Sequence, residues 1–313
     1  MIIPDKLKIG DTIGVIAPSN PIINENVEEI NKAKKIIEDL GFKVKFSKNL
    51  FSNTNIYSAT AKEKADDLNA MFSDKEVKMI WCAKGGENSN SIFEYIDYEN
   101  IKQNPKIICG YSDITSITNM ITEKTDLVTY SGTNFKTIAT DETDYSLKEA
   151  LKRFVDGSLE LGNSDQYITL KEGIAEGELI GGNLSLTRAM VSGKYSLDFT
   201  DKILFLEELG FETGPALASN YLYYMKQNGV FDKVKGIWIG NYTHESGITL
   251  EQILLDVIGD TFNGPIIKSE NFGHIENKIV IPIGMKAKID TSKKKKINIM
   301  NYWQIIIKNI LYI

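Results

Sequence analysis

Residues 107–114 are Ile107-Ile108-Cys109-Gly110-Tyr111-Ser112-Asp113-Ile114, an apolar run that gives way abruptly to small and polar residues. The apolar part predicts a buried strand that ends at Gly110, and the pattern beyond it predicts a helix that begins near Asp113. A buried strand followed at once by a helix is the repeating unit of parallel α/β folds. This stretch therefore indicates an α/β architecture for the first half of the chain.

The segments on both sides repeat the alternation of strand and helix. Apolar runs predict further strands over 11–18, 42–46, 77–82 and 127–130, and a 3.6-residue spacing predicts helices over 24–40, 59–72, 89–95 and 113–122. Strands that alternate with helices predict a parallel sheet with helices on both faces. We therefore predict an N-terminal domain of the flavodoxin-like or Rossmann-like kind.

A polar, turn-rich stretch over 156–165 follows one more predicted helix, and it predicts a domain boundary. The predicted domains are residues 1–155 and 156–313. In the second, the predicted strands are 166–170, 175–180, 202–207, 234–239, 278–281, 286–289 and 296–300, and the predicted helices are 184–191, 216–227 and 250–258. This pattern predicts a β-rich domain, barrel-like or sandwich-like, with a mixed or antiparallel sheet. The four lysines at 293–296 are expected to form an exposed hairpin tip.

The composition is that of a folded globular protein. Of 313 residues, 42% are hydrophobic and 25% are charged, which is enough to bury a core in each of about two domains. A net charge of −6 argues against a nucleic-acid or membrane partner, because both need a basic surface. Neither a signal-peptide pattern nor an apolar run of about 18 residues is seen, and Cys82 and Cys109 each end an apolar run, as buried reduced thiols do. We therefore expect a cytoplasmic enzyme or binding protein, with its apolar tail, 305–313, packed on the body.

Ser112 is the first candidate for chemistry. It lies on the predicted turn between strand and helix, where the hydroxyl is exposed and the first helical N–H groups can face a bound oxyanion. The pattern here is Gly-x-Ser-Asp, and Ser and Asp are also among the commonest helix N-caps. Ser112 is therefore either a nucleophile or a cap.

A nucleophilic serine needs a base, and the chain has only two histidines. His244 lies in a polar stretch that predicts a surface loop. His274 follows Gly273, which allows close backbone approach, and an apolar segment at 265–267. His274 is the better candidate, and a hydrogen-bonded loop histidine is the alternative.

The base in turn needs an orienting carboxylate. The apolar strand predicted over 202–207 ends in Glu207 and Glu208. Alternation along a strand puts these two on opposite faces, so only one can serve. We prefer Glu207, which is nearer the apolar run, and the alternative is that the strand simply ends in solvated acids.

A glycine turn over 82–90, with Gly85 and Gly86, also follows a strand and precedes a predicted helix. It lacks the nucleotide-loop patterns, which also disfavours a nucleotide-dependent Rossmann enzyme. The N–H of Gly86, together with that of Asp113, fits an oxyanion hole, and a plain turn is the alternative. A third glycine turn at 181–183 is expected to be structural. No His, Cys, Asp or Glu cluster has metal-ligand spacing, so we expect no metal and no cofactor.

Six separated motifs in order resemble one family. They are 9–11 with 15–19, 84–86, 109–113, 177–184, 205–208 and 272–274, spread over about residues 7–290. The chain resembles the serine peptidases of the LD-carboxypeptidase family, which includes microcin C immunity-type proteins. The resemblance implies a triad of Ser112, Glu207 and His274 and an oxyanion hole at Gly86 and Asp113. It also implies an α/β N-terminal domain, a β-rich C-terminal domain, a role in peptidoglycan recycling and often a homodimer.

The sequence departs from the family at positions that bind a terminal carboxylate. Lys84 stands where an Arg usually precedes the paired glycines, and residues 218–221 lack a usual Arg. The clamp then falls to Lys84, to Arg188 or to backbone N–H groups. The stretch with Glu87 and Asn88 looks more like the microcin-immunity branch, so both are candidate substrate contacts.

The predicted function is therefore a serine hydrolase of peptide or amide bonds, first of all an LD-carboxypeptidase acting on muropeptides. The alternative within this class is an amidase that cleaves peptidyl- or aminoacyl-nucleotide amides. The alternative of another class is a small-molecule binding protein without catalysis.

Overall fold

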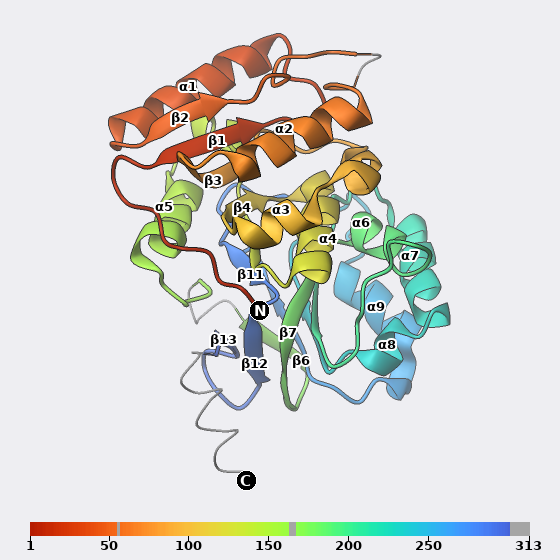
Figure 1. The fold of residues 1–313 in the computed structure, drawn as a ribbon. Helices are drawn as coiled ribbons and strands as arrows, with labels where there is room; N and C mark the ends of the chain where they lie inside the picture. The colour runs from red at the N-terminus through yellow and green to blue at the C-terminus, as the bar shows by residue number, and fades with distance from the viewer. Residues whose placement is uncertain (55–56, 163–166, 301–313) are drawn as a thin grey trace.

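The computed structural model describes residues 1–54, 57–162 and 167–300, and two sheets organise them (Figure 1). The first sheet has six strands in the order β11-β5-β4-β3-β1-β2. Its strands are β1 (Thr12–Ile16), β2 (Lys43–Phe46), β3 (Val77–Cys82), β4 (Ile107–Gly110), β5 (Thr129–Ser131) and β11 (Ile281–Ile283). All pair in parallel except β11, which is antiparallel to β5. The predicted parallel α/β sheet is confirmed.

Helices cover both faces of the first sheet because its strands bury side chains on both sides. The main helices are α1 (Glu25–Asp39), α2 (Ala61–Ser73), α3 (Tyr98–Gln103), α4 (Thr115–Thr125) and α5 (Tyr145–Leu151). Ile13 and Trp81 share a core with α1 and α5, whereas Ile80 and Ile108 share another core with α2, α3 and α4. Successive strand residues thus face opposite helix layers, as a doubly wound sheet requires.

Short turns of helix complete this part of the chain. They are the 3-10 turns η1 (Ser89–Tyr95), η2 (Ser112–Ile114) and η3 (Lys136–Ala139), and the π-helical turn η4 (Lys152–Asp156). The helix predicted over 113–122 therefore begins as a 3-10 turn at Ser112 and continues as α4. The helix predicted over 89–95 is 3-10 throughout, since seven residues with two serines favour a turn over a regular α-helix.

The second sheet is mixed and curls into a half-barrel, with strand order β13-β12-β7-β8-β9-β10-β6. Its strands are β6 (Tyr167–Lys171), β7 (Ile174–Asn183), β8 (Ile203–Glu207), β9 (Gly236–Ile239), β10 (Ile266–Ser269), β12 (Lys286–Asp290) and β13 (Ile297–Ile299). The central strands β7 to β10 are parallel, and β6, β12 and β13 pair antiparallel at the edges. The predicted β-rich, mixed architecture is confirmed.

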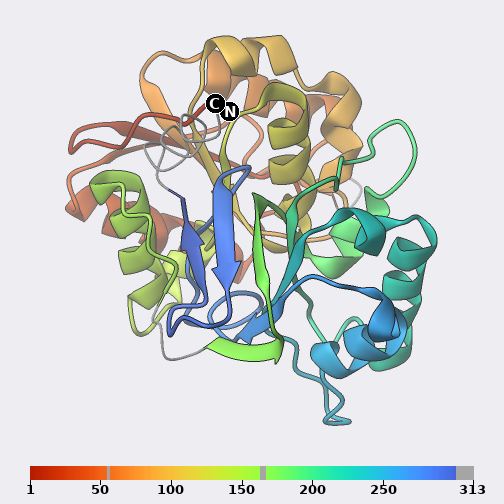
Figure 2. The same cartoon turned by 90° about the horizontal axis from the view of Figure 1, so that it is seen from below.

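Helices also belong to this second half: α6 (Leu184–Ala189), α7 (Pro215–Gln227), α8 (Val230–Lys233), α9 (Leu250–Ile258) and the 3-10 turn η6 (Gly259–Thr261). In Figure 2, α7 and α9 lie on the side of the molecule opposite α5. Helices α3 and α8 were not predicted because they are too short for a periodic signal, and β10 was not predicted either. It also placed one strand over 278–281, whereas the strand is β11 and joins the first sheet.

The two sheets are held together near their carboxyl edges by helix α4. Asn119 Nδ2 donates to Gly181 O at 2.8 Å, and Gly181 N donates to Asn119 Oδ1 at 3.0 Å. Asn183 N donates to Thr115 Oγ1 at 3.1 Å. These buried bonds fix the end of β7 against the first turns after β4, so strand ends of both sheets face one another.

Cys82 and Cys109 are free and buried, as predicted. The lysine run at 293–296 lies in the turn between β12 and β13. Among the described residues, no helix is both long and apolar enough to cross a membrane. The division into domains at residue 155 stays a prediction, and the tail 305–313 and positions 163–165 lie outside the described residues.

Candidate active site

Ser112 is the first residue of η2 and follows β4 closely, at the carboxyl edge of the first sheet. Its φ is +65°, a left-handed conformation that costs a residue with a Cβ roughly 1–3 kcal/mol. Such strain persists only where the surrounding structure fixes it, and it is typical of functional turns. Ser112 Oγ lies 3.0 Å from His274 Nε2, whereas the cap position of η2 belongs to Tyr111. The geometry of Ser112 is therefore not that of a helix cap.

His274 connects Ser112 to a buried acid. Its Nδ1 lies 2.7 Å from Oε2 of Glu207, the last residue of β8, which is 3% exposed. A carboxylate at Nδ1 favours the tautomer with its proton on Nδ1, which leaves the Nε2 lone pair facing Ser112 Oγ. Burial lowers the pKa of His274, but the charge and hydrogen bond of Glu207, helped by Glu208 and Glu212, outweigh this effect and raise the pKa above 6.5.

Gly273 explains how His274 can reach Glu207. Its φ is +116°, and a Cβ at this position would lie 3.0 Å from Glu207 Oε2. The backbone before His274 therefore packs directly on the carboxylate, and only glycine fits there without strain.

Glu208 is buried as well, at 2% exposure, and it points to the opposite side from Glu207. It accepts hydrogen bonds from Asn183 Nδ2 at 2.9 Å, Ser185 N at 2.9 Å and Leu209 N at 2.8 Å. Burial raises the pKa of Glu208, although these bonds oppose the rise. The expected alternation of the two acids is present, but neither ends in solvent: Glu207 faces His274, and Glu208 holds the start of α6.

The glycine turn after β3 packs against Ser112. A Cβ on Gly85 would lie 3.0 Å from Ser112 Cβ and 3.6 Å from the Asp113 backbone nitrogen. Gly86 has φ +153°, and its Cβ would lie 2.2 Å from Asn20 Cγ. The turn and the first residue after Ser112 thus border the same space, where backbone N–H groups can face an oxyanion.

A buried polar network lies beneath this turn. The carboxylate of Asp113 accepts from Ser19 Oγ at 2.5 Å and from Ser89 N at 2.8 Å, and burial raises its pKa. Lys64 Nζ donates to Asn88 Oδ1 at 2.9 Å, and burial lowers the pKa of Lys64 to about 8. The contact of Ser19 with Asp113 and the burial of Lys64 were not predicted from the sequence. The available signal was that Lys64 falls on the same helical face as Leu68 and Met71.

The remaining candidates occupy varied places. Lys84 Nζ donates to Asn26 Oδ1 at 3.0 Å, and Glu87 is exposed. The Arg188 guanidinium lies 4.8 and 4.9 Å from the ring centroids of Tyr221 and Tyr224. Asn88 is engaged with Lys64, as described above. The second histidine, His244, bonds Ser246 within its own exposed loop and takes no part in the series of Ser112, His274 and Glu207.

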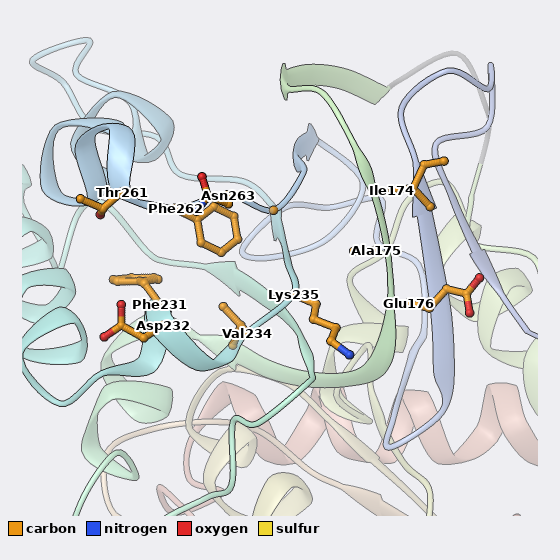
Figure 3. A pocket seen from close by; sticks show the side chains of 11 residues that line it. Ile174, Ala175, Glu176, Phe231, Asp232, Val234, Lys235, Thr261, Phe262 and Asn263 are labelled. Carbon is orange, nitrogen blue, oxygen red and sulfur yellow. The ribbon is translucent and has the colours of Figure 1, made fainter.

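A cavity lies away from Ser112, His274 and Glu207. It has a volume of about 620 Å³ and is found at the amino ends of β7, β9 and β10, the opposite edge of the second sheet (Figure 3). Lys235, Asp232 and Phe262 are among its lining side chains, which include neither histidine nor cysteine. No three His, Cys, Asp or Glu side chains in the described part of the chain are grouped to hold a metal. This cavity does not include Ser112, His274 or Glu207.

Comparisons with known proteins identify the domains of one family in this chain. A family model of the LD-carboxypeptidase N-terminal domain matches residues 13–132, and one of the LD-carboxypeptidase C-terminal domain matches residues 176–289. The probable murein peptide carboxypeptidase of Bacillus subtilis strain 168 is 34% identical, over 93% of this chain and 92% of that protein. The microcin C7 self-immunity protein MccF of Escherichia coli is 28% identical, over 92% of this chain and 93% of that protein.

Solved structures resemble the whole fold. The MccF-like protein from Bacillus anthracis strain Ames matches with a TM-score of 0.88 and 34% identity, covering 96% of this chain and 100% of that one. MccF in complex with aspartyl sulfamoyl adenosine matches with a TM-score of 0.84 and 25% identity, covering 97% and 99%. With both family domains matched in order and relatives above 30% identity over nearly its full length, the chain belongs to the LD-carboxypeptidase family of peptidases, S66.

Proposed function

We propose that this protein is a serine hydrolase that cleaves a peptide or amide bond. The observation that carries the proposal is the hydrogen-bonded series from Ser112 Oγ through His274 to Glu207, with bonds of 3.0 and 2.7 Å. The strained φ of Ser112 supports it, because the turn presents the hydroxyl to the histidine and not to the helix that follows.

In the proposed mechanism His274 Nε2 takes the proton from Ser112 Oγ as the oxygen attacks the substrate carbonyl. Glu207 holds the imidazole tautomer and stabilises the imidazolium. The N–H groups of Gly86 and Asp113 bind the oxyanion, each worth roughly 10²–10³ in rate. His274 then protonates the leaving amine, and a water molecule, deprotonated by the same imidazole, hydrolyses the acyl-enzyme.

The first substrate class is a muropeptide with a free terminal carboxylate, so that the protein acts as an LD-carboxypeptidase. The name of the B. subtilis relative supports this choice. In this proposal Lys84, Arg188 or backbone N–H groups hold the carboxylate, and Glu87 and Asn88 line the approach. The reaction needs no cofactor, and it would run in the cytoplasm as part of peptidoglycan recycling, in a homodimer.

The second candidate is an amidase that cleaves aminoacyl- or peptidyl-nucleotide amides. It is favoured by the likeness to MccF in complex with an aminoacyl sulfamoyl nucleoside. The catalytic groups are the same for both substrates, so only relative rates separate the two candidates.

The test is mass spectrometry of two compounds, each incubated with wild type and with the variants. One is a muramoyl tetrapeptide ending in D-alanine. The other is an aspartyl nucleotide in which an amide bond joins the aspartyl carbonyl to the adenosine nucleotide. We expect one of the two to be cleaved by wild type and neither by Ser112→Ala or His274→Ala. His244→Ala is the matched control, since it removes the other histidine, and it should keep wild-type turnover. Thermal unfolding should show all variants folded.

The outcomes separate the candidates. Release of D-alanine supports the carboxypeptidase, and release of aspartate from the nucleotide supports the amidase. Normal turnover in Ser112→Ala would refute the proposed nucleophile. Tight binding of either compound without cleavage by wild type would instead support a binding protein.

A further inference from the structure

Four lysines are buried in the described structure, and Lys268 among them is paired with Glu251 and Glu270. The other three differ in their contacts, and one of them has no evident structural task. Burial lowers the pKa values of Lys64, Lys106 and Lys278 to about 8. Lys106 donates to the carbonyl of Met71 at 2.8 Å and to that of Asp74, so it caps the end of α2. Lys64 holds Asn88. The amine of Lys278, on a residue only 2% exposed, has a single long hydrogen bond of 3.4 Å, to Glu276 O.

The contacts of Lys278 lead to the proposed base. Its Nζ lies 4.8 Å from the centroid of the Tyr111 ring. That ring lies 5.2 Å from the imidazole of His274, at an interplanar angle of 60°. An ammonium over an aromatic face is attracted by the ring quadrupole, more strongly when water is excluded. Tyr111, the neighbour of Ser112, thus contacts both the cation and the histidine ring.

Lys278 also shares a small cavity with Glu207. The cavity has a volume of about 10 Å³ and is lined by both residues together with Tyr111 and Gly273. This is about the space of one water molecule. The charged and titratable groups that face Lys278 are Asp141 beyond η3, Glu207 at the end of β8, Glu276 on its own segment and Tyr111. His274 contacts the same Tyr111 ring.

We propose that Lys278 is a positioning residue for the proposed active site: it holds the Tyr111 ring against His274 and keeps a positive charge beside Glu207. This inference rests on the proposed function for its catalytic meaning, but its electrostatic part is independent of turnover. A cation at this point favours the Glu207 carboxylate and disfavours the imidazolium. It therefore limits the rise that Glu207 causes in the pKa of His274.

The sign of the effect defines the experiment. Lys278→Met removes the charge, so His274 should hold its proton to a higher pH. Lys278→Arg keeps the positive charge over the whole pH range of the titration, because a guanidinium group does not lose its proton in that range. Lys106→Met is the matched control, since it removes another buried lysine with a pKa of about 8 that lies at the opposite edge of the first sheet.

The primary measurement is the NMR titration of histidine, which needs no substrate. The chain has two histidines, so a His244→Gln background leaves one signal. We expect Lys278→Met to raise the titration midpoint of His274 by about half a pH unit or more, and Lys278→Arg and Lys106→Met to leave it unchanged. An unchanged midpoint in Lys278→Met would overturn the proposal.

Kinetics on the substrate that wild type cleaves provide the second readout. We expect Lys278→Met to lower kcat by roughly 2- to 30-fold, with KM unchanged. Wild type should lose activity above pH 8 as Lys278 deprotonates, and Lys278→Arg should abolish this alkaline limb. Persistence of the limb in Lys278→Arg contradicts the proposal even if Lys278→Met fails to fold. A shifted His274 midpoint in a protein that cleaves neither substrate would refute the proposed function and leave this inference standing.

Discussion

Substitution of Gly86 by alanine tests the proposed oxyanion hole at its tightest point. A Cβ on Gly86 would lie 2.2 Å from Asn20 Cγ and 2.6 Å from Ser19 Oγ. Ordinary van der Waals contact begins near 3.4 Å, whereas the new Cβ would lie 2.2 Å from Asn20 Cγ. Either Asn20 or the glycine turn must therefore move by about 1.2 Å. Ser19 cannot yield easily, because its hydroxyl is bonded to the buried Asp113 carboxylate at 2.5 Å.

The size of the effect follows from this displacement. If the turn moves by about 1 Å, the Gly86 N–H no longer points at the oxyanion, and loss of one such donor costs roughly 10²–10³ in kcat. KM should change little, because the oxyanion exists only in the transition state and the tetrahedral intermediate. The φ of +153° adds backbone strain of roughly 1–3 kcal/mol to the folded state.

Steady-state kinetics and thermal unfolding of Gly86→Ala should be compared with Gly193→Ala. Gly193 also has a positive φ, +90°, but a Cβ there would meet no atom within 4 Å. We expect both variants to lose some stability and only Gly86→Ala to lose turnover. Retention of more than about a tenth of kcat by Gly86→Ala would refute the assignment of this N–H to the oxyanion hole.

Three further predictions follow from the same geometry. Gly273→Ala would place a Cβ 3.0 Å from Glu207 Oε2. The resulting displacement of the neighbouring His274 should lower kcat about 10- to 100-fold in the same assay, and a wild-type kcat would contradict this packing argument. Asn119→Ala leaves the N–H and carbonyl of Gly181 buried without their partner. Urea unfolding should therefore show that the free energy of unfolding falls by about 2–4 kcal/mol. A fall of less than about 1 kcal/mol would count against α4 as the link between the sheets. The pKa of His274 is raised above 6.5 and the base must be neutral, so kcat/KM measured from pH 5 to 8 should rise with a midpoint above 6.5, and a midpoint below 6 would exclude His274 as the base.

Periodicity predicted the long elements because their burial is regular. The helix predicted over 24–40 is α1 and the strand predicted over 202–207 is β8, since each has a single apolar pattern over its length. The family and fold class are likewise confirmed. The strand β11 was misplaced by a few residues, and its partner was not predicted, because pairing with β5 is decided by tertiary contact between segments about 150 residues apart.

At the candidate site, too, some residues were predicted from the sequence and others were not. Ser112, Glu207 and His274 were predicted from strand ends and from the scarcity of histidine, and the structure brings the three together, although their catalytic roles stay a prediction. The polar groups behind them were not predicted. Lys64 and Lys278 look like ordinary surface lysines in the sequence, since burial of a lysine depends on what folds over it and not on its neighbours in the chain.

The placement of the site on two sheets has a physical consequence. Ser112 follows β4 of the first sheet, whereas Glu207 ends β8 of the second sheet and His274 lies in the loop after β10. The 3.0 Å bond between Ser112 and His274 therefore spans the junction of the sheets. That bond contributes little to stability by itself, because a single hydrogen bond adds only about 1 kcal/mol. Its length must instead be set by the buried contacts of α4 with β7 and by β11, which crosses from the second half into the first sheet. Geometry suited to proton transfer is thus a property of the packed junction, and variants that loosen the junction should lower kcat before they unfold the chain.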